Sequence, residues 1–400
     1  MTIIWTYRLI FKLVIWTGRL MRIRRIKEYL SLRNDQKIQK ADVLFHCASL
    51  GEYQSIKPLL KSIRLKFSKI KVSVSFFSPS GFKYVDDQHL YDYKIYSPID
   101  KTQEVKNFID SVCPSLIIIS QNEIWPVFLT EIRERNIPFV YVDSYFRPTL
   151  INHIWLRLNR KSLTHSSKFF TQNHQTAELL QTLLKVEIEN VGSLRVENIE
   201  EELAHALPKY DLSAFIQKNP LIIFGSIHKS DWNVLVSTLV QLIGKFKIIL
   251  APHEMDQGFF IEMKKSLDAT QSSMWTEGIG EGTQVCILDE FGILKYLYKY
   301  ADIVYIGGGF GSGIHNVMEP AFYQKPIIVG PDMNKFHEAL HLEKEQVLFR
   351  IRNSNELLDV IESVSDLHSS IKSKYQSIQK TSERPSLKVI NHIIEKKLLN

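Results

Sequence analysis

Two successive series of short apolar runs, separated by stretches of helical periodicity, constrain the fold more than any other feature. The first series is VLFHCAS (43–49), IKVSVSFF (70–77), SLIIIS (115–120), IPFVYVDS (137–144) and KFFTQ (168–172). The second series is LIIFGS (221–226), FKIILAP (246–252), QVCILD (284–289), DIVYIGGG (302–309) and PIIVG (326–330). Continuous apolar runs of this length are typical of strands buried on both faces. The alternation with helices predicts two doubly wound, Rossmann-like α/β domains.

The polar stretch between the two series marks a boundary. Residues 195–220 contain a cluster of acids and prolines at 208 and 220. The expected organisation is a basic and apolar arm (1–40), a first α/β domain (41–200), a linker (201–219), a second α/β domain (220–366) and a C-terminal helix (367–400).

The N-terminal arm combines apolar and basic residues. Residues 3–16 are apolar with Trp5 and Trp16, and residues 1–40 carry ten Lys or Arg against two acids, which is +8 in a chain of net charge +7. The apolar part is too short for a comfortable spanning helix. We expect a helix in the membrane interface, with the basic residues on anionic lipid at the cytoplasmic side. The alternative is an ordinary helix that covers the first domain.

Three polar segments follow predicted strands of the first domain. Glu52 comes after the first strand, at a helix start near Tyr53, where a carboxylate could act as a general base. Glu123 follows the third strand, and Arg195, in GSLR, follows the last short strand and could bind phosphate or carboxylate. The alternatives are helix or loop capping for the acids and a solvated surface side chain for the arginine.

The second domain carries the stronger signal, a nucleotide site. Ser226 and His228 lie in a small-residue turn before a helix, which favours anion binding by backbone amides. Five of the fourteen residues 307–320 are glycine, which lets the backbone approach a phosphate closely. Asn316 and Glu319 are three residues apart, so we expect them on one helix face, where the acid could accept hydrogen bonds from ribose. The alternative, a flexible turn, explains only the glycines.

No metal site is expected. The three cysteines are far apart, and no H-E-x-x-H, D-x-D or clustered His/Cys set occurs.

Taken in order, these segments resemble the lipid A 3-deoxy-D-manno-octulosonic acid (Kdo) transferases, which are GT-B glycosyltransferases with two such domains facing across a cleft. The resemblance rests on SLGE (49–52), SPSG (78–81), NEIWP (122–126), GSLR (192–195), GSIH (225–228), GGGFGSGIHNVMEPA (307–321), KPIIVGP (325–331) and MNKF (333–336).

The resemblance implies roles for particular residues. Glu52 would be the base, and Glu123 and Arg195 would stabilise the transition state. The residues expected to bind the donor are Ser226, His228, Pro252, His253, Phe291, Gly292, Ile293, Gly308, Gly309, His315, Asn316, Val317, Met318 and Glu319.

The chain also departs from the family pattern. Gln121 stands where the family usually has a glutamate, and Arg195 replaces a lysine. The usual P-R-H reads Pro252-His253-Glu254, and Ile293 replaces a common glutamate. These departures indicate a divergent branch.

The implied function is inverting transfer of Kdo from CMP-Kdo to a phosphorylated lipid A precursor in lipopolysaccharide biosynthesis. The protein would act at the cytoplasmic face of the cell inner membrane, without a cofactor, a metal or nucleic acid. The alternatives are another GT-B transferase that uses a UDP-sugar, or a UDP-sugar epimerase.

Overall fold

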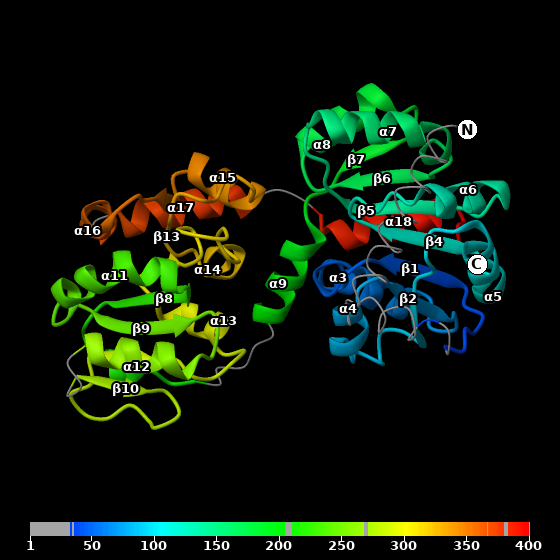
Figure 1. The fold of residues 1–400 in the computed structure, drawn as a ribbon. Coiled ribbons are helices and arrows are strands. Elements are labelled where there is room, and N and C mark those ends of the chain that lie inside the picture. The colour runs from blue at the N-terminus through cyan, green and yellow to red at the C-terminus, as the bar shows by residue number, and fades with distance from the viewer. Residues whose placement is uncertain are drawn as a thin grey trace, which may run out of the picture. The chain divides into compact units, whose positions relative to one another are not determined.

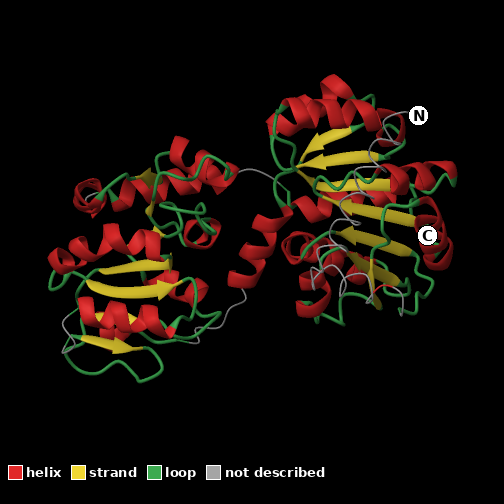
Figure 2. Ribbon diagram, viewed as in Figure 1, coloured by secondary structure: helices red, strands yellow, loops and turns green. Residues whose placement is uncertain are grey.

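The computed structural model divides into two compact units, each built on one parallel sheet (Figures 1 and 2). It describes residue 33 and residues 36–204, 210–267, 271–365, 367–379 and 383–399. The first unit comprises the residues up to Asn198 and those from Ser382, and the second runs from Ile199 to Thr381. The predicted membrane-interface helix lies outside the described residues.

The first unit contains a seven-stranded parallel sheet with the order β3-β2-β1-β4-β5-β6-β7. Its strands are β1 (Val43–Cys47), β2 (Val72–Phe76), β3 (Tyr93–Tyr96), β4 (Leu116–Ser120), β5 (Phe139–Ser144), β6 (Lys168–Thr171) and β7 (Ile188–Asn190). The chain order reverses between β1 and β4. In open parallel sheets the loops diverge at such a point and leave a crevice at the carboxyl ends of the strands.

Helices cover both faces of this sheet and bury a separate apolar cluster on each face (Figure 1). The helices of this unit are α3 (Leu50–Lys66), α4 (Pro79–Tyr84), α5 (Thr102–Val112), α6 (Pro126–Glu134), α7 (Leu150–Leu163), α8 (His174–Leu183), the start of α9 (Leu194–Ala204) and α18 (Pro385–Glu395). The cluster on one face includes residues of α3 and α18, and the cluster on the other includes residues of α5 to α8.

The second unit repeats the design, with the strand order β10-β11-β9-β8-β12-β13-β14 and a reversal between β8 and β12. Its strands are β8 (Leu221–Ile227), β9 (Lys247–Pro252), β10 (Ser272–Met274), β11 (Val285–Ile287), β12 (Ile303–Ile306), β13 (Ile327–Val329) and β14 (Leu348–Arg350). Its helices are α10 (Ser213–Ile216), α11 (Lys229–Leu242), α12 (Gln257–Ser266), α13 (Leu294–Leu297), η1 (Tyr298–Tyr300), α14 (Met318–Phe322), α15 (His337–Lys344), α16 (Ser354–Ser365) and α17 (His368–Gln379).

The prediction of two doubly wound parallel α/β domains is confirmed. Each of the ten apolar runs coincides with a strand of one of the two sheets. The four strands outside those runs are β3, β7, β10 and β14, and they are the four edges of the two sheets. Edge strands pair on one side only, so they need less apolar sequence.

The domain boundaries differ from the expected ones at both ends of the chain. Arg33 and Gln36, assigned to the arm, donate to backbone carbonyls of the first unit: Arg33 Nε to Ser97 O at 2.9 Å and Gln36 Nε2 to Tyr96 O at 3.0 Å. Residues of the expected linker, Leu212 among them, lie in the core of the second unit instead.

The segment 367–400, expected as one helix, contains two. α17 lies in the second unit, whereas α18 packs on α3 in the first. Glu197 fixes the start of α18, because its carboxylate accepts hydrogen bonds from Ser386 N at 2.9 Å and Ser386 Oγ at 2.6 Å. The last helix therefore completes the core of the first unit.

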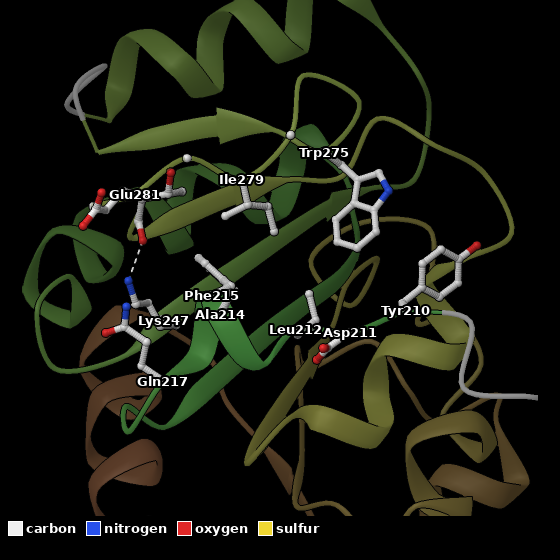
Figure 3. Close-up of a pocket in the computed structure, with 14 residues that line it drawn as sticks. Tyr210, Asp211, Leu212, Ala214, Phe215, Gln217, Lys247, Trp275, Ile279 and Glu281 are labelled. Atoms are coloured by element: carbon white, nitrogen blue, oxygen red, sulfur yellow. Dashed lines mark hydrogen bonds between the residues drawn. The ribbon is translucent and has the colours of Figure 1, made fainter.

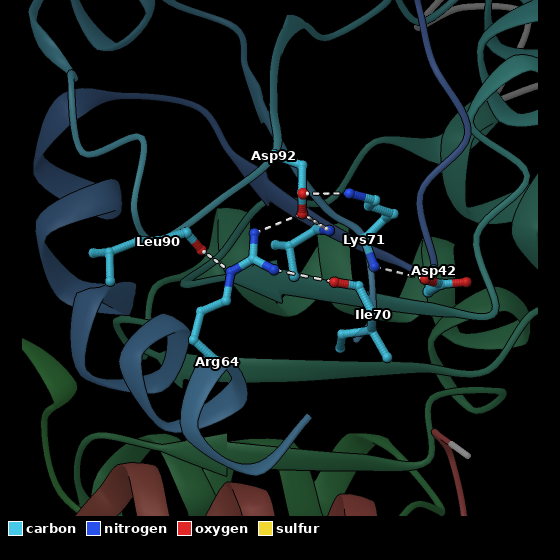
Figure 4. Close-up of polar contacts among 7 residues, drawn as sticks. Asp42, Arg64, Ile70, Lys71, Leu90 and Asp92 are labelled. Carbon is cyan, nitrogen blue, oxygen red and sulfur yellow. Dashed lines mark hydrogen bonds and ion pairs between the residues drawn. The ribbon is translucent and has the colours of Figure 1, made fainter. Parts of the chain in front are cut away.

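An ion-pair network at the amino edge of the first sheet ties α3 to β2 and β3 (Figure 4). Asp92 accepts from Arg64 Nη2 at 2.6 Å and from Lys71 Nζ at 3.0 Å. Arg64 also donates to the carbonyl oxygens of Leu90 at 3.1 Å and Ile70 at 3.0 Å. Because Arg64 lies in the last turn of α3, the network orients that helix, whose other end carries Glu52.

We expect Ile393→Ala in α18 to destabilise the first unit by about 2–4 kcal/mol, because its side chain is fully buried. Urea unfolding of the full chain, followed by circular dichroism, measures this change. The neighbouring Ile394 is 45% exposed, so Ile394→Ala should change the free energy of unfolding by less than about 0.5 kcal/mol. Equal effects of the two variants would show that α18 does not contribute to the core.

Candidate active site and nucleotide site

Glu52 lies in the first turn of α3, directly after β1 and at the reversal point of the first sheet. Ser49 caps this helix, and its hydroxyl accepts from Glu52 N at 3.4 Å. The Glu52 carboxylate reaches back and accepts from the backbone N–H of Ala48 at 2.6 Å. α3 begins at Leu50, slightly earlier than the predicted start near Tyr53. Glu52 thus takes part in the cap of α3 and also lies at the crevice, so the two interpretations of this residue are compatible.

Glu123 follows β4, the strand beside β1, so the two acids belong to neighbouring strand ends. Trp125 Nε1 donates a hydrogen bond to the Glu123 carboxylate. Tyr141 donates from its hydroxyl to the Glu123 carbonyl at 3.0 Å. Gln121, the departure from the family pattern, has a positive φ of 54° and donates from Nε2 to Ser55 Oγ at 3.5 Å.

Burial raises the pKa of the Glu52 carboxyl to about 8, and the nearby Glu123 carboxylate adds to the effect. Burial also raises the pKa of Glu123 and that of Asp143. Carboxylates that share a poorly solvated site resist simultaneous ionisation. Near neutral pH this group therefore holds protons that ordinary surface acids would have lost.

Asp143 is a buried acid of this site that the sequence analysis did not single out. It lies in β5 with a positive φ of 53°, and its Oδ1 accepts from Leu194 N at 2.9 Å. The Leu194 amide begins α9, so Asp143 holds the turn that presents Arg195. The signal in the sequence was a polar residue near the end of the apolar run 137–144, which capping or solvation explains equally well.

Arg195 is exposed in the first turn of α9. Its backbone neighbour is tied to Asp143, and the charge of Asp143 acts on Glu52. The structure thus links the segments that carry the three predicted catalytic residues Glu52, Glu123 and Arg195 within one unit. Their roles remain predictions.

In the second unit, three histidines follow the carboxyl ends of three adjacent strands, β9, β8 and β12. The ring centroids lie 4.6 Å apart for His228 and His253, and 4.1 Å apart for His253 and His315. The Nε2 atoms of His228 and His315 are 2.6 Å apart. The sequence predicts no metal site because no histidine cluster is visible in it. That premise is wrong in three dimensions, because the sheet brings together histidines that are distant in sequence.

Burial lowers the pKa of His253, and it lowers that of His315 to about 4. Both rings are therefore neutral at physiological pH. They can donate or accept hydrogen bonds at this edge, but they add no positive charge.

Asp231 anchors the backbone of this edge, although it is not among the residues expected to bind the donor. Its Oδ2 accepts from His228 N at 2.8 Å and from Gly308 N at 2.7 Å. Its Oδ1 accepts from the Tyr305 hydroxyl at 3.0 Å. One buried carboxylate thus joins the turn after β8 to the glycine loop after β12.

The glycine loop needs its glycines for close backbone contacts. A Cβ on Gly309 would lie 2.6 Å from the Cα of Gly330, and one on Gly307 would lie 2.3 Å from the carbonyl oxygen of Ser226. Gly308 has a φ of +90°, which side chains rarely adopt. Ser226 itself has a positive φ of 55°. The glycine loop therefore lies against Ser226 and Gly330, with no room for side chains between them.

Asn316 and Glu319 contact each other as predicted, but not on one helix. α14 begins at Met318, so Asn316 precedes it. Asn316 Nδ2 donates to Glu319 Oε1 at 3.0 Å, and its Oδ1 accepts from Met318 N at 3.0 Å. Val317, the residue before the helix, is buried. The Asn316 side-chain amide therefore orients the Glu319 carboxylate, although the two residues do not share a helix.

The other expected donor residues flank the same edge. Pro252 ends β9 opposite Ile227. Phe291 is exposed, Gly292 has a φ of +84° and Ile293 is buried just before α13. A Cβ on Gly225 would lie 3.3 Å from the Leu294 side chain of α13, which places this segment beside β8.

A cavity of about 630 Å³ lies in the second unit, near the amino ends of β8, β9 and β11 (Figure 3). Its walls include Tyr210, Phe215 and Trp275, and Lys247 lies at the first position of β9. Lys247 Nζ donates to the carbonyl oxygen of Thr283. Lys247 and Thr283 lie at the amino ends of β9 and β11, whereas the glycine loop follows the carboxyl end of β12.

Among the described residues, no helix combines the length and the apolar character needed to cross a bilayer.

We expect Glu52→Gln to raise the melting temperature by about 10–20 °C near pH 8.5, and by far less near pH 5. The folded-state pKa of Glu52 lies above its unfolded value, so the wild type loses stability as pH rises toward about 8. Each pKa unit corresponds to about 1.4 kcal/mol, and each kcal/mol to about 2–4 °C in a domain of this size. Calorimetry at both pH values measures the shift.

The matched control for this comparison is Glu134→Gln, at the exposed end of α6. It should leave the melting temperature unchanged at both pH values. A Glu52→Gln effect that is the same at both pH values would contradict the raised pKa.

Comparison with known proteins gives matches that span most of the chain. A family model described as 3-deoxy-D-manno-octulosonic-acid transferase (kdotransferase) matches residues 18–198. The 3-deoxy-D-manno-octulosonic acid transferase of Aquifex aeolicus is 26% identical over 84% of this chain and 90% of that protein. The one of Rickettsia felis is 26% identical over 84% of this chain and 76% of that protein. A bifunctional glycosyltransferase/methyltransferase of Fusobacterium nucleatum is 23% identical, and the match spans 90% of this chain but 59% of that protein.

Solved structures agree on the fold. A putative UDP-N-acetylglucosamine 2-epimerase from Listeria monocytogenes superposes with a TM-score of 0.61 at 12% identity, covering 90% of this chain and 96% of that one. A glycosyltransferase from Rickettsia africae superposes with a TM-score of 0.53 at 14% identity, covering 90% and 99%. Both show the two-domain GT-B type of fold. The family model and the relatives that share its sequence, rather than these folds, support the assignment of this chain to the Kdo transferase family of glycosyltransferases.

Proposed function

We propose that this enzyme transfers Kdo from CMP-Kdo to a hydroxyl of a phosphorylated lipid A precursor in lipopolysaccharide biosynthesis, with Glu52 as the general base. The observation that carries the proposal is the placement of Glu52, a buried carboxyl at the reversal point of the first sheet with a raised pKa. Its family membership supports the choice of sugar.

In the proposed reaction, Glu52 takes a proton from the acceptor hydroxyl as that oxygen attacks the anomeric carbon of the sugar. A base works best when its pKa lies near the working pH, because it is then both ionised and strong enough to accept a proton. An ordinary glutamate would be too weak. Burial supplies the increase here, and Glu123 maintains it through its negative charge.

The donor would be held by the second unit. The glycine loop lies beside the start of α11, where a Cβ on Gly311 would be 2.8 Å from Ser230 Oγ, and the first amides of a helix suit a phosphate group. Glu319, oriented by Asn316, would accept hydrogen bonds from the ribose hydroxyls. CMP becomes a better leaving group when donors stabilise the charge that develops on its phosphate.

Arg195 would offset negative charge on the sugar carboxylate or on an acceptor phosphate. Its exposure in the first turn of α9 leaves its planar fork of donors available to solvent and to ligands. Asp143 would position it by holding the Leu194 amide.

We expect Glu52→Gln to lower turnover about 10²–10⁴-fold, the usual value of a general base, with CMP affinity unchanged. Mass spectrometry measures transfer in a mixture of purified protein, CMP-Kdo and a tetra-acylated lipid A precursor, and calorimetry measures CMP binding.

In the wild type the transfer rate should rise with pH up to about 8, because the base must lose its proton. Glu123→Gln should move this rise to lower pH by removing a neighbouring negative charge.

Glu134→Gln is the control and should transfer Kdo at the wild-type rate. Near-normal turnover of Glu52→Gln would remove Glu52 from the mechanism. A donor other than CMP-Kdo would be revealed by calorimetry in which UDP binds more tightly than CMP. The transferases and epimerases that use UDP-sugars are otherwise not favoured, because the family match identifies Kdo transferases.

We further propose that the protein acts at a membrane surface, the cytoplasmic face of the inner membrane. Apart from the predicted arm, one described helix supports this. The side chains of Leu150, Ile151, Ile154 and Leu158 of α7 are exposed, the first two by 76% and 78%. Arg160 and Lys161 lie in the last turn of the same helix. Apolar side chains beside basic ones suit a surface that contains anionic lipid.

The double variant Ile151→Asp/Leu158→Asp should bind anionic vesicles at least about 10-fold more weakly, because each side chain can bury apolar area worth about 1.5–3 kcal/mol. Sedimentation with vesicles of phosphatidylglycerol and phosphatidylethanolamine measures this. Leu65→Asp, at an exposed leucine of α3, is the control and should bind like the wild type. Unchanged binding of the double variant would show that α7 does not contact lipid.

A further inference from the structure

We propose that His228, His253 and His315 form a binding site for one divalent transition-metal ion of the zinc type. One ligand atom from each ring can be chosen so that the three lie within 4.8 Å of one another. Bound zinc lies about 2.0–2.1 Å from histidine nitrogen, which puts two such nitrogens about 3.3 Å apart on one ion. The three rings therefore need only side-chain rotations to reach a common ion.

The backbone that carries these rings is fixed by the sheet. Each histidine comes from the carboxyl edge of a different strand, and the three strands are neighbours. His253 N donates to the carbonyl oxygen of Ile227 at 2.9 Å, which holds it beside His228. Asp231 holds both His228 and the loop that leads to His315. A site built on sheet ends in this way is more rigid than one built on long loops.

The shortest contact in the cluster shows how the rings are directed. The Nε2 atoms of His228 and His315 lie 2.6 Å apart, and their ring planes differ by 6°. Two ring nitrogens this close cannot both carry a hydrogen, so at least one lone pair points into the cluster. A metal ion replaces the shared proton when the two atoms separate by about 0.7 Å to reach zinc geometry.

The donor set suits a particular class of ion. Imidazole nitrogens favour Zn²⁺, Co²⁺, Ni²⁺ or Cu²⁺ over Mg²⁺ or Ca²⁺, which prefer oxygen. Three protein ligands leave a position open for water or for an oxygen of an anion. His253 also stands where the family usually has arginine, whose guanidinium stays protonated and cannot bind a metal. The same departure that removes a cation thus supplies the third imidazole.

The open position offers a role within the nucleotide site. A phosphate oxygen of the donor could occupy it, so that the ion supplies positive charge where this chain lacks the arginine. This second step rests on the proposed function, whereas the metal site itself does not.

Cobalt is the probe for the site, because four-coordinate Co²⁺ has strong visible absorption bands. We expect the chelator-treated full-length protein to bind one Co²⁺ per chain in competition with a chromophoric chelator, and Zn²⁺ to displace it. His253→Arg and His315→Gln should each weaken binding about 100-fold or more, since even the outer partners of metal ligands are worth about 10–100-fold. His341→Gln, at an exposed histidine of α15, is the matched control and should bind like the wild type.

Wild-type protein that binds no Co²⁺, or His253→Arg that binds as tightly as the wild type, would overturn the site. Circular dichroism of each variant shows whether it is folded, and His228→Gln gives a third test of the ligand set. Adding CMP should change the cobalt spectrum if its phosphate enters the open position, and an unchanged spectrum would overturn that step. CMP binding to metal-free protein, measured by calorimetry, tests the nucleotide site separately from the metal.

Discussion

Parallel strands that all point the same way bring their carboxyl ends to one edge, and a reversal of strand order opens that edge. Both units use this constraint, between β1 and β4 in the first and between β8 and β12 in the second. Glu52 and Glu123 follow the first pair, and His228 and the glycine loop follow the second. The functional residues are therefore placed by topology, and their local turns only adjust their direction.

Burial then decides what those residues can do. A solvated glutamate after β1 would be ionised and weak, whereas the sheet and α3 remove water from Glu52 and raise its pKa to about 8. The hydrogen bonds from Ala48 and Ser49 act in the opposite direction and limit the increase. The site thus balances desolvation against hydrogen bonding, and the raised pKa of Glu52 costs the protein stability at high pH.

The sequence predicted the inner strands and the residues that follow them, because fully buried strands need unbroken apolar runs. It did not predict edge strands such as β10 (SSM), whose half-exposed positions tolerate serine. It also placed Asn316 on a helix, since spacing alone cannot show that α14 starts at Met318. The histidine cluster escaped detection for a different reason. Its members come from three strands, and no local pattern records which strands become neighbours.

The two reversal points have the same geometry but opposite electrostatic character. The first gathers three buried acids, Glu52, Glu123 and Asp143, whose pKa values burial raises, and the charges of the other two add to the increase at Glu52. The second contains backbone amides and the neutral rings of His253 and His315. Asp231, the buried acid among the described residues there, already accepts from three hydrogen-bond donors. This contrast fits the proposed base at the first point and the proposed phosphate site at the second. A repeated scaffold thus acquires two different chemistries from the few residues that follow four strands.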